Sequence, residues 1–140
     1  MGGVSTAFVA GVTRSATGIV LDGVNGYVDL NFKVVSIGGP MTIEVMAKWS
    51  ALGSWSRLFD CGDGEASDNI VLANRDMTGK FNYINFQGNR VGNLADSRDD
   101  IAVGVRYHIV ATVSGATMVV YINGVEMVNI NSGQESIVKA

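Results

Sequence analysis

Acidic residues gather in one glycine-rich segment, residues 60–69, which has the composition of a metal site. Calcium takes about six to eight oxygen ligands in proteins, and carboxylates, an amide and loop carbonyls supply such oxygens. Glycines stand at two positions where an EF-hand needs Asp or Asn, so that motif is excluded. We interpret the segment either as a calcium site or as a turn whose carboxylates are solvated or accept hydrogen bonds from loop amides. The candidate ligands are Asp60, Asp63, Asp68 and Asn69.

Aromatic and planar polar residues occur together in the middle of the chain, a combination that suits a sugar. An aromatic side chain offers a face to the apolar side of a sugar ring, and amide and guanidinium groups pair with hydroxyls. The alternative is that Tyr83 packs in the core and Trp55 caps it, because strand alternation directs one face of residues 80–86 inward. The candidate binding residues are Trp55, Asn74, Arg75, Tyr83, Asn85 and Arg90.

Nucleophilic catalysis has little support in the sequence. His108 is the single histidine, and its same-face neighbours on the expected strand, Arg106 and Val110, include no carboxylate or nucleophile. Cys61 is the single cysteine, so it forms no internal disulfide, and it has no basic neighbour to activate the thiol. We expect a structural or solvated histidine and a small packed cysteine, and no enzyme activity.

Length and composition set the class of protein. A chain of 140 residues with 47% hydrophobic and 16% charged residues predicts one folded domain over residues 1–140 and excludes a disordered chain. The net charge is −3 and the Lys and Arg residues are scattered, which argues against a nucleic-acid partner. No apolar run approaches the roughly 20 residues of a membrane helix, so we expect no membrane insertion. The first ten residues lack the basic region of a signal peptide.

Period-two alternation of hydrophobic residues predicts an all-β sandwich or barrel of about ten short strands. Residues 17–21 and 27–30 are expected as strands on either side of an Asp-Gly and Asn-Gly turn, and residues 41–49 as a half-buried antiparallel strand. Further strands are expected at 56–61, 69–74 and 80–86, whereas residues 88–104 lack a clear period and are interpreted as a surface excursion with at most a weak strand at its end.

The last third of the chain predicts a meander of three strands, at residues 106–114, 116–122 and 125–130. Asn123 and Gly124 lie between two alternating apolar runs, which is the strongest short-range signal for a hairpin with a type I′ turn.

Several short motifs in a fixed order give the sequence a family resemblance. They are LDGVNGYV at 21–28, MTIEV at 41–45, RLFD at 57–60 with DNI at 68–70, and HIVATV at 108–113 running to YINGV at 121–125. In this order they resemble the laminin-G-like branch of the concanavalin A-like lectin/glucanase superfamily. The resemblance implies a two-sheet antiparallel jelly-roll sandwich whose concave face and rim loops bind glycans or extracellular protein partners, at the cell exterior or on a surface or particle.

Two consequences of the resemblance concern what this chain lacks. Superfamily members that are retaining glycosidases need two carboxyls about 5 to 5.5 Å apart, and the four glutamates are too widely spaced for a pair on one strand. A pair assembled from different strands stays open. Family members also continue past the Asn-Gly hairpin, so the closing strand must come from residues 136–139, from another chain, or from a further part of the protein, and an open sheet edge favours association.

The sequence thus supports three functions, in decreasing order of support. The first is a non-catalytic carbohydrate-binding or adhesive module that uses rim loops and one sheet face. The second is a structural or assembly subunit built from a jelly roll, as a homo-oligomer or completed by a missing strand, without sugar binding. A glycan hydrolase is third.

Overall fold

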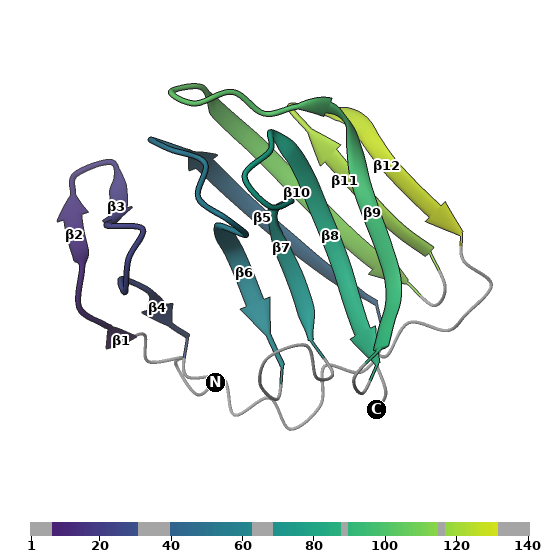
Figure 1. Cartoon of the computed structure of the whole chain (residues 1–140), viewed down its shortest axis with the longest axis horizontal. Helices are drawn as coiled ribbons and strands as arrows, with labels where there is room; N and C mark the ends of the chain where they lie inside the picture. Colours follow the sequence, from purple (N-terminus) through teal and green to yellow (C-terminus); the bar gives the residue numbers. More distant parts are fainter. Residues whose placement is uncertain (1–6, 31–39, 63–68, 88–89, 115–116, 132–140) are drawn as a thin grey trace. The chain divides into compact units, whose positions relative to one another are not determined.

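The computed structural model describes residues 7–30, 40–62, 69–87, 90–114 and 117–131. The chain divides into two compact units, Met1–Val35 and Ser36–Ala140 (Figure 1). The described residues form twelve strands and no helix, which confirms the all-β prediction. No helix of membrane-spanning length and apolarity occurs among them.

The N-terminal unit consists of two small antiparallel pairs. β1 (Ala7–Phe8) pairs with β4 (Val28–Asp29), and β2 (Val12–Ser15) pairs with β3 (Gly18–Leu21). The sequence predicts the two strands that include β3 and β4, but each of them pairs with an earlier strand that period-two alternation did not show. Hydrogen bonds to one side chain hold the segment between β3 and β4 as a loop, so these two strands do not pair with each other as a hairpin.

That side chain belongs to Asp22. Its Oδ1 accepts hydrogen bonds from the backbone N–H groups of Val24, Asn25 and Gly26, at 2.9, 3.1 and 2.9 Å. These hydrogen bonds, that of Val24 first, lower the pKa of the Asp22 carboxyl because they favour its charged form. The Asp22 backbone N–H in turn donates to the Gly11 carbonyl at 2.9 Å.

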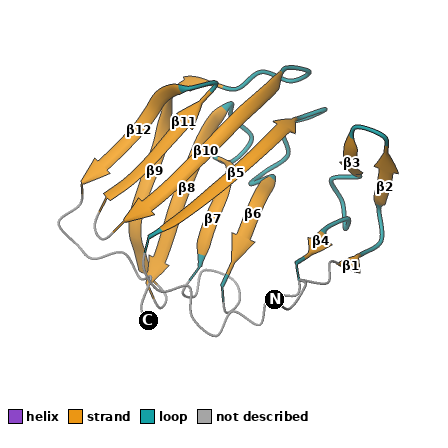
Figure 2. Ribbon diagram, turned by 180° about the vertical axis from the view of Figure 1, so that it is seen from behind, coloured by secondary structure: helices purple, strands orange, loops and turns teal. Residues whose placement is uncertain are grey.

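The second unit is a sandwich of two four-stranded antiparallel sheets. One has the order β12–β11–β10–β5, with β12 at Val125–Asn131, β11 at Thr117–Ile122, β10 at Arg106–Ser114 and β5 at Met41–Lys48. The other has the order β6–β7–β8–β9, with β6 at Arg57–Cys61, β7 at Ile70–Asn74, β8 at Lys80–Gln87 and β9 at Arg90–Asp100. The sheets lie face to face, with β5 and β10 in front of β7 and β8 in Figure 2.

Alternation along β5 shows how sequence determines the sheet faces. Met41, Ile43, Val45 and Ala47 are half-buried and pack against the core, while the residues between them are exposed. This confirms the half-buried antiparallel strand predicted from period two. β5 pairs with β10 from Lys48 opposite Arg106 to Met41 opposite Val113, without a bulge.

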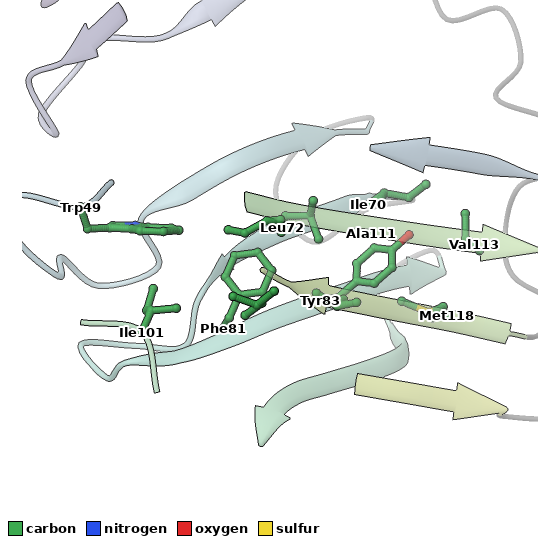
Figure 3. Packing of buried hydrophobic residues seen from close by; sticks show 12 residues of the cluster. Trp49, Ile70, Leu72, Phe81, Tyr83, Ile101, Ala111, Val113 and Met118 are labelled. Atoms are coloured by element: carbon green, nitrogen blue, oxygen red, sulfur yellow. The ribbon is translucent and has the colours of Figure 1, made fainter. Parts of the chain in front are cut away.

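The core lies between the two sheets. Its fully buried side chains come from β7, β8, β10 and β11, and Figure 3 shows Phe81 and Tyr83 of β8 pointing into the space between the strands. Trp49 meets Phe81 edge to face, with ring centroids 6.2 Å apart. Such pairs add about 0.5 to 1.5 kcal/mol beyond the area they bury. Trp49, at the end of β5, thereby joins one sheet to the other.

The β11–β12 hairpin confirms the turn predicted at Asn123 and Gly124. Both residues have positive φ angles, 52° and 78°, as a type I′ turn requires. The Asn123 Oδ1 also accepts a hydrogen bond from the backbone N–H of His108 at 2.9 Å, which ties the turn to β10.

The prediction for residues 88–104 is wrong. β9 is a strand of eleven residues that pairs with β8 from Gln87 opposite Arg90 to Lys80 opposite Asp100. Two irregularities interrupt its register, and its sequence mixes Asp, Arg, Gly and Asn, so period two is hidden. The ladder with β8, which is not local in sequence, determines the strand. The closing strand expected at residues 136–139 lies outside the described residues.

Candidate functional site

The sheet β6–β7–β8–β9 has a second face, opposite the core, that we call the outer face. Side chains alternate between the two faces of a strand, so Leu72 points into the core while Val71 and Ala73 point outward. With Ile84 of β8 these two residues form an apolar cluster separate from the core, and Trp55 packs against it. This outer face therefore has a small apolar strip at its centre, and the strip is itself buried, with Val71 5%, Ala73 0% and Ile84 3% exposed.

One polar cluster adjoins the strip at β6. Arg57 Nη1 donates to Asp60 Oδ2 at 2.7 Å, and Asn69 Nδ2 donates to Asp60 Oδ1 at 3.1 Å. Asp60 is opposite Val71 in the ladder, which places the carboxylate beside the apolar strip. Its side chain is 28% exposed, so one carboxylate is held by two donors and still reaches solvent.

A second polar cluster repeats this arrangement at β8 and β9. Asn82 Nδ2 donates to Asp96 Oδ1 at 2.6 Å, and the Arg75 guanidinium forms an ion pair with the other oxygen of Asp96. Asn82 is opposite both Ala73 and Asp96 in the ladders of β8. The Asp96 side chain is 29% exposed, close to the value for Asp60.

Both clusters thus hold a carboxylate between a guanidinium and a carboxamide. In each one the asparagine is buried, and its Oδ1 has no hydrogen-bond partner among the described residues. The guanidinium groups of Arg57 and Arg75 and the two carboxylates are the parts that remain exposed. Together they present donors and acceptors in a fixed arrangement on either side of the apolar strip.

Trp55 lies in the loop before β6, and the buried side chain of Asn74 holds this loop in place. Trp55 has a φ of 55°, in the left-handed region, and its backbone N–H donates to the Asp76 carbonyl at 3.0 Å. Asn74 is fully buried, accepts from the Ser56 N–H at 2.8 Å and donates to the carbonyls of Gly53 and Asp76 at 2.9 and 2.7 Å. Its carboxamide therefore joins the loop before β6 to the loop after β7.

The predicted binding residues separate into three groups in the structure. Trp55 and Arg75 lie at the outer face. Tyr83 is only 1% exposed and packs in the core instead, where burial raises the pKa of its phenol. Asn74 has no exposed surface and holds loops instead of offering its amide to a ligand. Asn85 and Arg90 are in β8 and β9, opposite Asn93 and Gln87, and their side chains lie outside the described part of the chain.

Arg57, Asn82 and Asp96 are also parts of this surface and were not among the candidate binding residues. The alternation of β8 does place Asn82 and Ile84 on one face, opposite Phe81 and Tyr83, and this was the available signal. Asp96 gave no comparable signal, because its strand was interpreted as a surface excursion.

The structure describes half of the predicted calcium site. Asp60 and Asn69 are in contact, whereas Asp63 and Asp68 lie outside the described residues. Within the described ranges no group of three or more His, Cys, Asp or Glu side chains is placed to hold a metal ion. Calcium binding by this segment stays a prediction.

Two other titratable groups have no place in the outer face. His108 Nε2 lies 2.7 Å from Glu44 Oε1 on the exposed face of the other sheet, as a solvated pair. Burial raises the pKa of the Cys61 thiol, and the neighbouring charge of Asp60 raises it further. The thiol therefore stays protonated and weakly nucleophilic at neutral pH.

Comparison with known proteins agrees with this architecture. No curated protein matches the chain. A solved structure that it resembles is an S-layer domain-containing protein from Clostridium thermocellum, with a TM-score of 0.55 and 25% sequence identity. The match covers 94% of this chain and 62% of that one, so this chain spans less than two thirds of the solved structure. A laminin G family model, described as Concanavalin A-like lectin/glucanases superfamily, matches residues 22–139. The chain therefore belongs to this laminin G family of the concanavalin A-like superfamily.

Proposed function

We propose that this protein is a non-catalytic carbohydrate-binding module that holds a glycan on the outer face of the sheet β6–β7–β8–β9. The observation that carries the proposal is the pair of Arg–Asp–Asn clusters on either side of the Val71, Ala73 and Ile84 strip. The family membership supports it, because lectins are part of this superfamily's description.

The chemistry of the outer face suits a hydroxylated ring. Each sugar hydroxyl donates one hydrogen bond and accepts others, so it pairs well with a carboxylate that lies beside a guanidinium. Asp60 and Asp96 supply exposed acceptors, and Arg57 and Arg75 supply the donors. The half-buried Trp55, which packs against the buried strip, offers an aromatic surface for the C–H side of the ring.

The positions of the carboxylates support binding without hydrolysis. Asp60 is on β6 and Asp96 is on β9, three strands away in the same sheet. Neighbouring strands lie about 4.8 Å apart, so the two carboxylates are separated by about 14 Å. A retaining glycosidase needs about 5 to 5.5 Å between its carboxyls and an inverting one at most about 9.5 Å.

The place of action is proposed from the same comparisons. The chain matches a laminin G family model, and the structural neighbour is named as an S-layer domain-containing protein. We infer that this chain works outside the cell or on the surface of a particle, where a glycan or an extracellular protein is its ligand.

A glycan array followed by calorimetry tests the proposal. We expect the protein to bind a defined set of glycans and two variants to bind them at least about tenfold more weakly. Trp55→Ala removes the aromatic surface, and Asp96→Ala removes a hydrogen bond to a charged group, which is worth about 1.5 to 3 kcal/mol. Glu44→Ala, on the opposite sheet, is the matched control and should leave affinity unchanged. Equal affinity in all four proteins would contradict the proposed site, and no glycan binding at all would contradict the function.

A structural or assembly subunit is the second candidate. The name of the Clostridium thermocellum neighbour favours it, since an S-layer is a protein coat. Light scattering on the same samples separates the two functions, because a large uniform oligomer that binds no glycan supports assembly and a glycan-binding monomer excludes it.

A further inference from the structure

The strand β5 ends one sheet of the sandwich. The sheet order is β12–β11–β10–β5, and among the described residues β10 is the strand that pairs with β5. One side of β5 therefore presents backbone N–H and C=O groups that the described part of the chain does not use. Such an edge is a template for pairing with another strand.

Burial across this sheet decreases towards β5. Three core-facing residues of β10, Ile109, Ala111 and Val113, are at most 3% exposed, and a fourth, Tyr107, is half-buried. The core-facing residues of β5, from Met41 to Ala47, are only half-buried although they pack on the same core. Another strand alongside β5 would cover these side chains, as β5 itself covers those of β10.

Few of the features that protect a sheet edge from pairing with another chain occur in β5. Its eight residues include no proline and no glycine, and its ladder with β10 has no bulge. Charges occur only on its solvent face, at Glu44 and Lys48, and between them Met46 is 58% exposed. Edge strands normally avoid association through exposed charges, especially lysine, through proline, through bulges or through charges that point inward, and of these β5 has only Glu44 and Lys48.

The two charges of β5 are spaced for pairing with a second copy of the same strand. When two copies run antiparallel with Met46 opposite Met46, Glu44 of each copy is opposite Lys48 of the other. The core faces also match in this register, because Val45 is then opposite Ala47. We infer that two copies of this chain pair through their β5 edges and form one continuous eight-stranded sheet about a twofold axis.

Charge also disfavours a neighbouring register of this pairing. If the twofold axis passes through Glu44 instead of Met46, the Glu44 carboxylates of the two copies lie directly opposite each other, which is destabilising. Glu44 already contacts His108 at 2.7 Å, but a carboxylate has two oxygens and accepts from both partners. Complementary charges thus select the Met46-centred dimer.

Charge reversal with rescue tests this dimer in the full chain. We expect sedimentation equilibrium to show a concentration-dependent dimer. Glu44→Lys alone and Lys48→Glu alone should each raise its dissociation constant about tenfold or more, because each variant puts two pairs of like charges across the axis. The double variant Glu44→Lys with Lys48→Glu should restore dimerisation, since opposite charges face each other again. Lys80→Glu, on the other sheet, is the control.

The outcomes divide clearly. Rescue by the double variant supports the β5 interface, and circular dichroism confirms that the single variants fold. A monomer at every concentration would overturn the inference, as would an oligomer that neither single variant weakens. The inference is independent of glycan binding, because β5 and the outer face belong to different sheets.

Discussion

At the scale of single residues, Asp22 shows how one carboxylate organises a segment. One oxygen accepts three backbone hydrogen bonds, and these lower its pKa. A depressed pKa in the folded state means that the ionised form stabilises the fold above the unfolded pKa of about 3.8. The stabilisation is lost as the pH falls through the folded pKa. We therefore expect the 21–27 loop to stay closed down to a pH below 3.8 and to open only in stronger acid.

A carbon-detected NMR titration of the Asp22 carboxyl measures this directly. The expected midpoint lies below 3.8, and protection of the Val24 and Gly26 amides should decrease at the same pH. Asp22→Asn is the control, because an amide oxygen still accepts hydrogen bonds but does not ionise in this range. A midpoint at or above 3.8 in the wild-type protein would show that the three hydrogen bonds do not form in solution.

Residue types alone identified only part of the candidate site. Trp55 and Arg75 were found because their chemistry suits a sugar, and Tyr83 was misplaced for the same reason. Whether an aromatic residue points inward depends on which face of its strand the second sheet covers. The alternation of residues 80–86 separates the two faces but does not show which of them is covered, so it left the position of Tyr83 open. Asp96 pairs with Arg75 across 21 residues of sequence, and only the strand register brings them together.

At the scale of elements, the β11–β12 hairpin depends on one glycine. Gly124 has a φ of 78°, and its turn connects the two strands beside the core residue Ile122. A left-handed conformation costs an L-residue about 1 to 2 kcal/mol, and a β-branched one is still less tolerant. We expect Gly124→Val to lower the free energy of unfolding by about 1 to 2 kcal/mol in urea denaturation.

Val125→Thr is the matched variant for this hairpin. Val125 is 49% exposed in the adjacent position, and threonine is also β-branched, so stability should change by less than about 0.5 kcal/mol. Equal stability of Gly124→Val and wild type would mean that the turn does not have positive φ at this position.

The acidic segment at residues 60–69 carries the calcium prediction. We expect Asp63→Ala with Asp68→Ala to lower the melting temperature only when calcium is present, because the wild-type protein alone would gain stability from the ion. Differential scanning calorimetry with calcium and with a chelator checks this. An equal loss under both conditions would show that the carboxylates serve the turn and not an ion.

Strand elements were predictable where alternation was clean. β5, β10, β11 and β12 all show period two, so their positions follow from the sequence. β9 does not, because its polar residues and bulges hide the alternation, and its pairing with β8 is non-local. The partners of β3 and β4 were also hidden, since β1 and β2 are very short.

At the scale of the whole molecule, the two faces of one sheet differ in their side chains. The inner face of β6–β7–β8–β9 builds the core with the other sheet, and the outer face carries the two Arg–Asp–Asn clusters. In the proposed function, the alternation of side chains on the same strands thereby separates the core from the glycan-binding face. The β5 edge, in the other sheet, is separate from both.

The location of glycan binding is the central claim, and amide chemical-shift mapping tests it most directly. A glycan selected on the array is titrated into isotopically labelled protein, and shifts are followed for every amide. We predict the largest changes at Asp60, Val71, Asn82 and Asp96, and at the Trp55 indole, with little change along β10. Changes concentrated on the β5–β10–β11–β12 sheet, or none at the outer face, would contradict the account.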